Sequence, residues 1–192
     1  MKPIKAIVIL AVTSTLLFAN NGYNNKEIQQ IVKDGNMASQ TLIKTLGKNL
    51  KQHLKHGGAL NALSFCSNQA MSITEKVNSK LPKGISVQRI SEKYRNPSDA
   101  PNAQEATILS AFQTLQDNHV VMPKYLIQKV NNNTYRYYKP LLISKKACLI
   151  CHGNISKNPQ LAKQIKKRYP LDKATGYKMG DLRGAVVVTI VK

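Results

Sequence analysis

The residues with the clearest potential for chemistry lie together in the run Cys148-Leu149-Ile150-Cys151-His152. In an exported chain, the spacing Cys-x-x-Cys-His indicates covalent attachment of a c-type haem. The two thiols add across the two vinyl groups at one edge of the porphyrin, and a short helical turn brings both sulfurs to that edge. The imidazole then ligates the iron. We therefore predict one haem c per chain, with Cys148 and Cys151 as thioether links and His152 as the proximal iron ligand.

Three other readings of the same run remain as alternatives. A thioredoxin-like redox pair normally follows a strand in a βαβ unit, and the final strands of this chain do not supply that setting. A zinc site would add one further ligand to Cys148, Cys151 and His152, whereas structural zinc normally uses two separated ligand pairs. A plain structural disulfide is the third alternative.

Cys66 is the one cysteine outside this run. Its spacing places it on the apolar stripe of an expected helix, facing the core. It is either a small buried hydrophobe, as free cysteines often are, or a thiolate ligand on the second side of the iron. Other residues compete for that second position: Met179 in the Gly176–Gly180 turn, Met122, and the histidines His53, His56 and His119.

The amino-terminal residues 1–19 have the pattern of a secretory signal peptide. Lys2 and Lys5 give a positive start, an apolar stretch runs from Ala6 to Phe18, and Ala19 precedes the expected cleavage site. An uncleaved membrane anchor is the alternative. We expect the protein in the periplasm, an oxidising compartment in which thiols are normally paired or ligated.

Apolar residues spaced three and four apart predict most of the helices. The first helix covers residues 24–56 and ends at Gly57-Gly58, and a second covers about 59–80, so the two are expected to pack as a hairpin. The same spacing predicts a helix at 103–116. A basic helix begins at Asn158-Pro159 and extends to about Tyr169.

Runs of β-forming residues predict a small antiparallel sheet. Residues 125–130 and 134–144 form a hairpin around the turn 131–133, and residues 85–90 form a short strand. Residues 184–191 predict a central strand, and Pro140 indicates a strand edge or a local irregularity. The fold class is therefore α+β, with residues 20–192 as a single domain.

The chain is strongly basic, with 29 Lys and Arg against 9 Asp and Glu and a net charge of +20. Export and the excess of Lys over Arg argue against a nucleic-acid partner, because base and bidentate phosphate readers favour Arg. A lysine-rich solvated surface is the simpler interpretation. The alternative is a basic face that docks an acidic redox partner or anionic lipid. The sequence leaves the oligomeric state open.

Two segments resemble a known family: YRYYKPLLISKKACLICHG at 135–153 and YPLDKATGYKMGDLRGAVVVTI at 169–190, with Arg95-Asn96-Pro97 as a further similar segment. The family consists of small exported c-type haem proteins with a PAS-like fold. It includes a cyanobacterial, Tll-like type and was long catalogued as a domain of unknown function. The same domain looks like the sensory input of some kinases and chemoreceptors.

The resemblance implies a PAS-like antiparallel sheet with long amino-terminal helices that cradles a covalently bound haem. It also implies His on one side of the iron and, on the other, a Cys thiolate from an amino-terminal helix. Cys66 occupies that helix, with Met179 as the fallback. As donors for the haem propionates we expect Arg95, Tyr177, Lys178 and Arg183, since such contacts are charge-assisted.

The sequence predicts a non-enzymatic function. With two protein ligands on the iron, we expect a periplasmic mono-haem cytochrome that acts in electron transfer or redox sensing. The alternative is a gas or redox sensor that signals to a separate partner when Cys66 leaves the iron. A peroxidase-like enzyme is disfavoured, because neither His119 nor Arg95 lies in a recognisable catalytic spacing.

Overall fold

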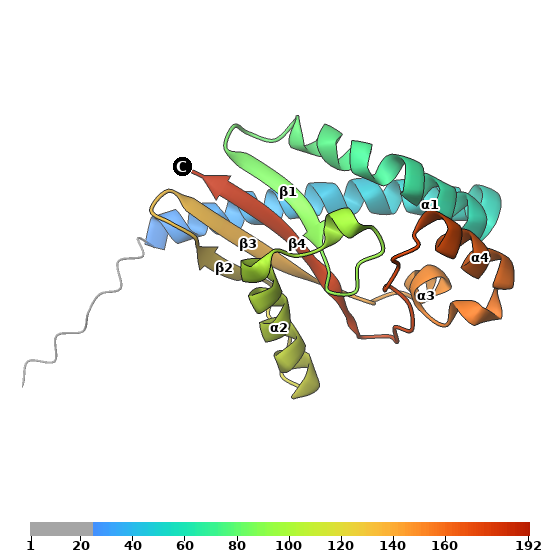
Figure 1. Ribbon diagram of the computed structural model, residues 1–192. Helices are drawn as coiled ribbons and strands as arrows, with labels where there is room; N and C mark the ends of the chain where they lie inside the picture. The colour runs from blue at the N-terminus through green and yellow to red at the C-terminus, as the bar shows by residue number, and fades with distance from the viewer. Residues whose placement is uncertain (1–24) are drawn as a thin grey trace, which may run out of the picture.

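The computed structural model describes residues 25–192, so the predicted signal peptide at residues 1–19 lies outside the described residues. Within them, four α-helices accompany one four-stranded antiparallel sheet (Figure 1). This confirms the predicted α+β class and its long amino-terminal helices. No helix within residues 25–192 combines the length and the apolar character needed to cross a membrane.

Helix α1 (Asn25–Asn78) is two helices joined at a sharp bend. Gly58 has a φ of 63° and a ψ of −158°, a combination that glycine adopts readily because it lacks a Cβ. The ring of His53 stacks on the ring of Phe65 across the bend, with a centroid distance of 4.6 Å. The second half therefore folds back beside the first, which confirms the predicted helical hairpin (Figure 1).

The sheet has the strand order β1-β4-β3-β2, and all neighbours are antiparallel. Its strands are β1 (Ile85–Ile90), β2 (Leu126–Lys129), β3 (Thr134–Leu142) and β4 (Leu182–Val191). The four predicted strands are confirmed, and β4 is an interior strand as its apolar run predicts.

The central part of β4, residues 184–188, is apolar because helices cover both of its faces. Val186, Val188 and Ile190 belong to the core under α1, whereas Ala185 and Val187 belong to the core under α2 (Ala103–Asp117). Successive side chains of a strand point to opposite faces, so a strand buried on both sides needs no polar alternation.

Pro140 lies in the part of β3 that no longer pairs with β2. The pairing of β2 with β3 ends at Leu126 opposite Tyr138, and the register between β3 and β4 shifts at Leu141/Leu142. A proline cannot donate a backbone hydrogen bond, so it is tolerated where one side of the strand is unpaired. The predicted local edge and irregularity are confirmed.

Two short helices, α3 (Lys146–His152) and α4 (Pro159–Arg168), lie beyond the sheet at the end of the molecule where α1 bends back (Figure 1). The side chain of Asn158 accepts a hydrogen bond from the Leu161 N–H, which confirms the predicted start of the basic helix. Leu161 and Ile165 of α4 are buried against Leu63 of α1. This packing fixes the end of the molecule that carries the Cys-x-x-Cys-His run.

The close approach of α1 to the sheet generates a prediction about Gly35. A Cβ at this buried position would overlap the ring of Tyr137, whose Cδ2 atom would be 2.5 Å away. We expect Gly35→Ala to lower the free energy of unfolding by about 1–3 kcal/mol through overpacking. Chemical denaturation measures the change.

Gly47 on the same helix is the matched control. A Cβ at this exposed position meets nothing within 4 Å. Gly47→Ala should therefore raise the free energy of unfolding by up to about 1 kcal/mol through helix propensity alone. Equal effects of the two substitutions would contradict the packing argument.

Candidate functional site

Helix α3 carries all three residues of the predicted attachment site. Cys148, Cys151 and His152 are half-buried, and both thiols are free. The N–H of Gly153 donates to the carbonyl oxygen of Leu149 at 2.9 Å and closes the last turn. A side chain at Gly153 would press against that carbonyl, at 2.7 Å from the added Cβ. The short helix thus ends directly after His152.

The imidazole of His152 is held in one tautomer. Its Nδ1 lies 2.9 Å from the carbonyl oxygen of Ala174, and because a carbonyl can only accept, Nδ1 carries the proton. Burial, together with the positive charges of Arg183 and Arg95, lowers the pKa of His152 to about 3. The ring is therefore neutral at physiological pH, with the lone pair of Nε2 available to a metal ion.

Arg95 ties this helix to the loop that follows α4. Its Nε and Nη2 atoms each lie 3.2 Å from a carboxylate oxygen of Asp172. Nη2 also donates to the carbonyl oxygens of Cys151, at 2.7 Å, and of Ala174, at 3.2 Å. Arg95 is only 8 % exposed, so this is an internal bidentate ion pair.

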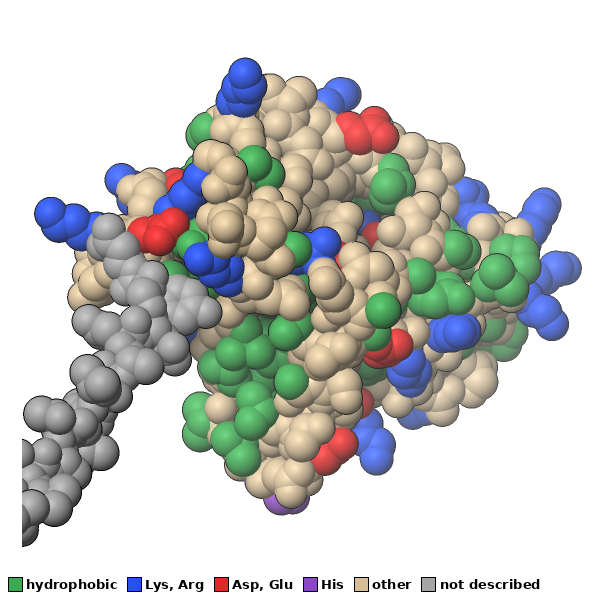
Figure 2. Space-filling model, turned by 60° about the vertical axis from the view of Figure 1, so that its left-hand side comes forward, with side chains coloured by type: hydrophobic (Ala, Val, Ile, Leu, Met, Phe, Trp, Pro, Cys, Tyr) green, Lys and Arg blue, Asp and Glu red, His purple; other side chains and the backbone are tan. Residues whose placement is uncertain are grey.

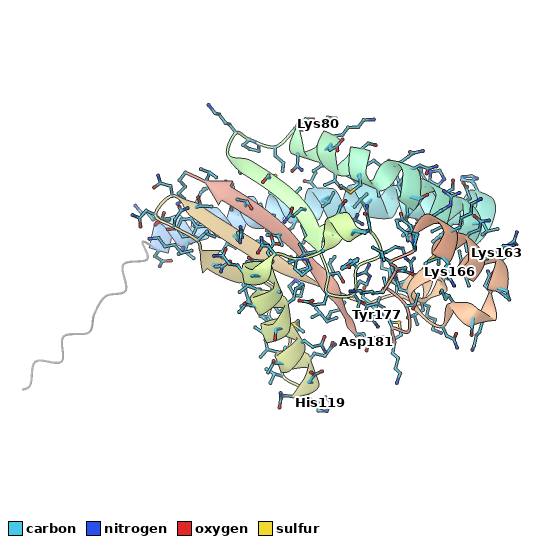
Figure 3. All side chains as sticks on the ribbon, viewed as in Figure 1. Lys80, His119, Lys163, Lys166, Tyr177 and Asp181 are labelled. Carbon is cyan, nitrogen blue, oxygen red and sulfur yellow. The ribbon has the colours of Figure 1, made fainter. Side chains whose placement is uncertain are left out.

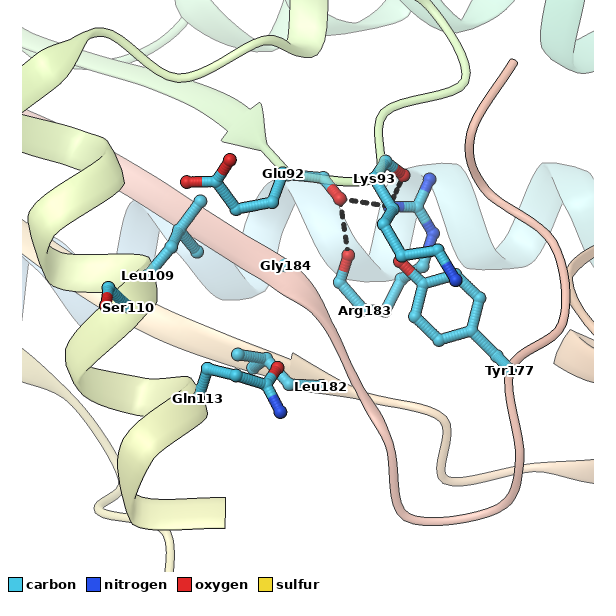
Figure 4. A pocket seen from close by; sticks show the side chains of 10 residues that line it. Glu92, Lys93, Leu109, Ser110, Gln113, Tyr177, Leu182, Arg183 and Gly184 are labelled. Carbon is cyan, nitrogen blue, oxygen red and sulfur yellow. Dashed lines mark hydrogen bonds between the residues drawn. The ribbon is translucent and has the colours of Figure 1, made fainter. Parts of the chain in front are cut away.

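Tyr177 lies between His152 and two cations. Its ring meets the imidazole edge to face, with centroids 6.2 Å apart. The Lys93 ammonium lies 4.5 Å from the ring centroid and the Arg183 guanidinium 5.6 Å from it. Arg183 donates through Nη1 to the Ser91 hydroxyl at 2.6 Å (Figure 4). No carboxylate among the described residues forms an ion pair with Lys93 or Arg183.

A cavity of about 390 Å³ opens beside these cations, between α2 and β4. Leu109 and Gln113 line it from α2, Leu182 and Arg183 line it from β4, and Tyr177 lies beside Arg183 (Figure 4). Such a volume falls in the usual range for small-molecule pockets. The positive side chains make its Tyr177 wall suitable for carboxylate groups.

The predicted propionate donors therefore differ in their surroundings. Tyr177 and Arg183 lie together beside His152. Arg95 directs Nε and Nη2 at internal acceptors, so only its Nη1 is left for an external anion. The Lys178 residue is exposed in the loop before β4. Lys93, which the sequence analysis did not select, belongs with the first pair.

Cys66 lies beside the attachment helix although 85 residues separate it from Cys151. Burial raises the pKa of the Cys66 thiol, and the nearby Cys151 thiol raises this pKa further, while Arg89 and Arg95 oppose the increase. Leu63, one turn earlier on α1, packs in the same apolar cluster as Cys151. The structure thus brings Cys66 close to Cys151 of the attachment helix.

The competing candidates form two groups: two histidines lie on α1, and three residues line a second cavity that shares Lys93 and Tyr177 with the first. His119, Met122 and Met179 line this second cavity, of about 770 Å³, next to the end of α2. Val120 and Val121 are exposed there. Figure 2 shows hydrophobic side chains gathered over the lower part of one face of the molecule. His53 stacks on Phe65, and His56 is exposed.

The same geometry bears on the zinc alternative. Within residues 25–192, no three side chains of His, Cys, Asp or Glu gather closely enough to hold a metal ion by themselves. A zinc ion needs its protein ligands around a single point. In a covalently attached haem, by contrast, the two thiols bond to the edge of the porphyrin and only the imidazole binds the iron, so the three side chains need not meet at one point.

The Arg95 network leads to a stability prediction. Arg95→Met leaves the buried carboxylate of Asp172 without its cation, and we expect the free energy of unfolding to fall by roughly 3–5 kcal/mol. Arg168→Met is the control, because Arg168 is exposed and donates only to the Ser67 hydroxyl. Its effect should stay within about 0.5 kcal/mol. Thermal and chemical denaturation measure both, and similar losses would refute a special role of the buried pair.

Comparisons with known proteins agree with the resemblance predicted from residues 135–190. The family model described as Tll0287-like, Tll0287, matches residues 16–191. Among solved structures, the chain is similar to the "cyanobacterial heme-protein Tll0287", with 26% identity and a TM-score of 0.59 over 88% of this chain and 98% of that chain. No curated protein matches the chain. Because the family match spans nearly the whole sequence, the chain belongs to the Tll0287-like family.

Proposed function

We propose that this protein binds one haem c through Cys148 and Cys151 and acts as an exported, non-enzymatic electron-transfer or redox-sensing cytochrome. The observation that carries the proposal is the arrangement on α3, where two free thiols and one imidazole occupy a single short helix. The solved relative is described as a heme-protein, which supports the same cofactor here.

The residues present fit a covalently attached porphyrin. Cys148 and Cys151 supply the two sulfurs, and His152 offers the Nε2 lone pair because the Ala174 carbonyl fixes the proton on Nδ1. Tyr177, Lys93 and Arg183 supply a positive and aromatic wall next to that imidazole. The bound group would contribute a one-electron iron couple.

Cys66 is our candidate for the second axial ligand. Its support is proximity, because the Cys151 thiol lies close enough to raise the pKa of the Cys66 thiol, and Leu63, one turn earlier on α1, packs in the same apolar cluster as Cys151. A thiolate donates charge and stabilises the oxidised iron, so it would lower the reduction potential. Met179 remains the fallback, although its side chain lines the cavity next to α2 and is 49 % exposed.

Covalent attachment is tested by the cysteines themselves. We expect the protein from a maturation-competent host to retain its pigment after denaturation and acid–acetone extraction. Cys148→Ser/Cys151→Ser should lose all extraction-resistant pigment, because no thioether can form. Cys66→Ser, the matched control, should retain it. Pyridine haemochrome spectra measure the bound pigment, and pigment-free wild-type protein would refute the proposal.

The axial ligand is tested by a pair of substitutions on different elements. Cys66→Ala should change the optical and EPR spectra of the oxidised protein and raise its reduction potential, because the thiolate is lost. Met179→Leu should leave both unchanged. The opposite pattern would assign the position to Met179.

The same samples separate the two modes of action. Reduced wild-type protein whose absorbance does not change on addition of CO supports simple electron transfer. A spectral change that Cys66→Ala makes faster would instead favour the gas or redox sensor, in which Cys66 leaves the iron and a separate partner reads the change.

A further inference from the structure

Acidic residues are scarce in two segments of this chain, which are rich in lysine. Residues 143–180, which include α3 and α4, contain nine Lys and Arg and a single acidic residue, Asp172. Residues 35–74, which include the bend of α1, contain four Lys and no acidic residue. Asp172 is itself buried and paired with Arg95. The remaining charges of these two segments are therefore almost entirely positive.

The fold gathers these two segments into one surface, the basic end. Figure 1 shows α3 and α4 next to the place where α1 turns back, and Figure 3 shows Lys163 and Lys166 on α4, with Lys80 at a distance from them, just beyond the end of α1. Both α4 lysines are exposed, and the three ion pairs found within residues 25–192 involve other residues. The uncompensated charge thus faces solvent around the attachment helix.

The chemistry of the basic end favours a protein over a membrane. A basic helix binds lipid by inserting its apolar face, but the apolar residues of α4, Leu161 and Ile165, are 0 % and 1 % exposed beneath α1. The chain also has no Trp to anchor at a lipid interface. Lysine, which dominates here, is a compact and strongly hydrated charge suited to loose pairing with carboxylates, whereas bidentate phosphate recognition favours arginine.

An apolar side chain lies within this positive surface. Ile150, between the two cysteines of α3, is 44 % exposed. Transient complexes combine long-range charge attraction, which raises the association rate, with a small apolar contact at the point of docking. Ile150 gives the attachment helix such a contact.

We infer that the basic end, formed by α3, α4 and the bend of α1, is the docking surface for an acidic partner protein. The inference rests on the proposed function, since it places the partner against the helix that would hold the haem. An acidic partner docked on the basic end would lie next to this helix.

Binding of the haem-loaded full chain to poly-L-glutamate at low ionic strength tests the surface. We expect Lys163→Glu/Lys166→Glu to weaken binding about tenfold, because two attractive contacts become repulsive. Lys80→Glu/Lys83→Glu is the matched control, with the same change in net charge at a distance from the basic end, and should weaken binding less than about twofold. Circular dichroism checks that each variant is folded. If Lys163→Glu/Lys166→Glu misfolds, Lys163→Gln/Lys166→Gln takes its place.

Three outcomes would overturn the inference. Equal weakening by both pairs of substitutions would mean that only net charge matters. Failure of the wild type to bind poly-L-glutamate would refute the inference that an acidic partner binds the basic end. Tighter binding to phosphatidylglycerol vesicles than to poly-L-glutamate would assign the basic end to a membrane. Binding to poly-L-glutamate does not require the pigment, so a haemochrome assay on the same samples shows separately whether the proposed function fails.

Discussion

The backbone carbonyl of Ala174 is the point on which the candidate site depends. It accepts hydrogen bonds from both His152 Nδ1, at 2.9 Å, and Arg95 Nη2, at 3.2 Å. The Ala174 N–H in turn donates to Asp172, whose carboxylate pairs with Arg95. This closed network fixes the imidazole tautomer and joins α3 to the loop before β4. Because every member is buried or half-buried, the loss of one leaves the others without partners at a considerable cost.

Opposing electrostatic influences meet at this site. Arg95 pairs with Asp172, whereas Lys93 and Arg183 lie beside Tyr177 without an ion pair to any described carboxylate. Positive charge near a redox group favours its reduced form, but an axial thiolate favours the oxidised form. If Cys66 supplies the thiolate, the cations around Tyr177 partly offset its effect. The protein would thus set its potential through groups that come from α1, the loop after β1 and β4.

Sequence patterns predicted those features that are encoded locally. The bend at Gly57-Gly58, the apolar strand β4 and the attachment run each lie in one continuous segment, so spacing and residue type are sufficient to find them. The Arg95–Asp172 pair joins residues 77 positions apart, and no local pattern links them. Nothing in the sequence indicates the role of the Ala174 carbonyl, because every residue has a backbone carbonyl. Lys93 became recognisable only when the fold placed it over the Tyr177 ring.

Stability does not account for the scarcity of acidic residues at the basic end. Lys166, Lys167 and Arg168 suit the last turn of α4, where cations interact favourably with the helix dipole. Lys163 lies outside that turn, and α4 contains no acidic residue to pair with any of them. Interspersed Glu residues would relieve this repulsion through pairs at i and i+4, at no cost to the buried Leu161 and Ile165. A surface that forgoes this stabilisation, and does so around the attachment helix, is better explained by what it attracts than by what it packs against.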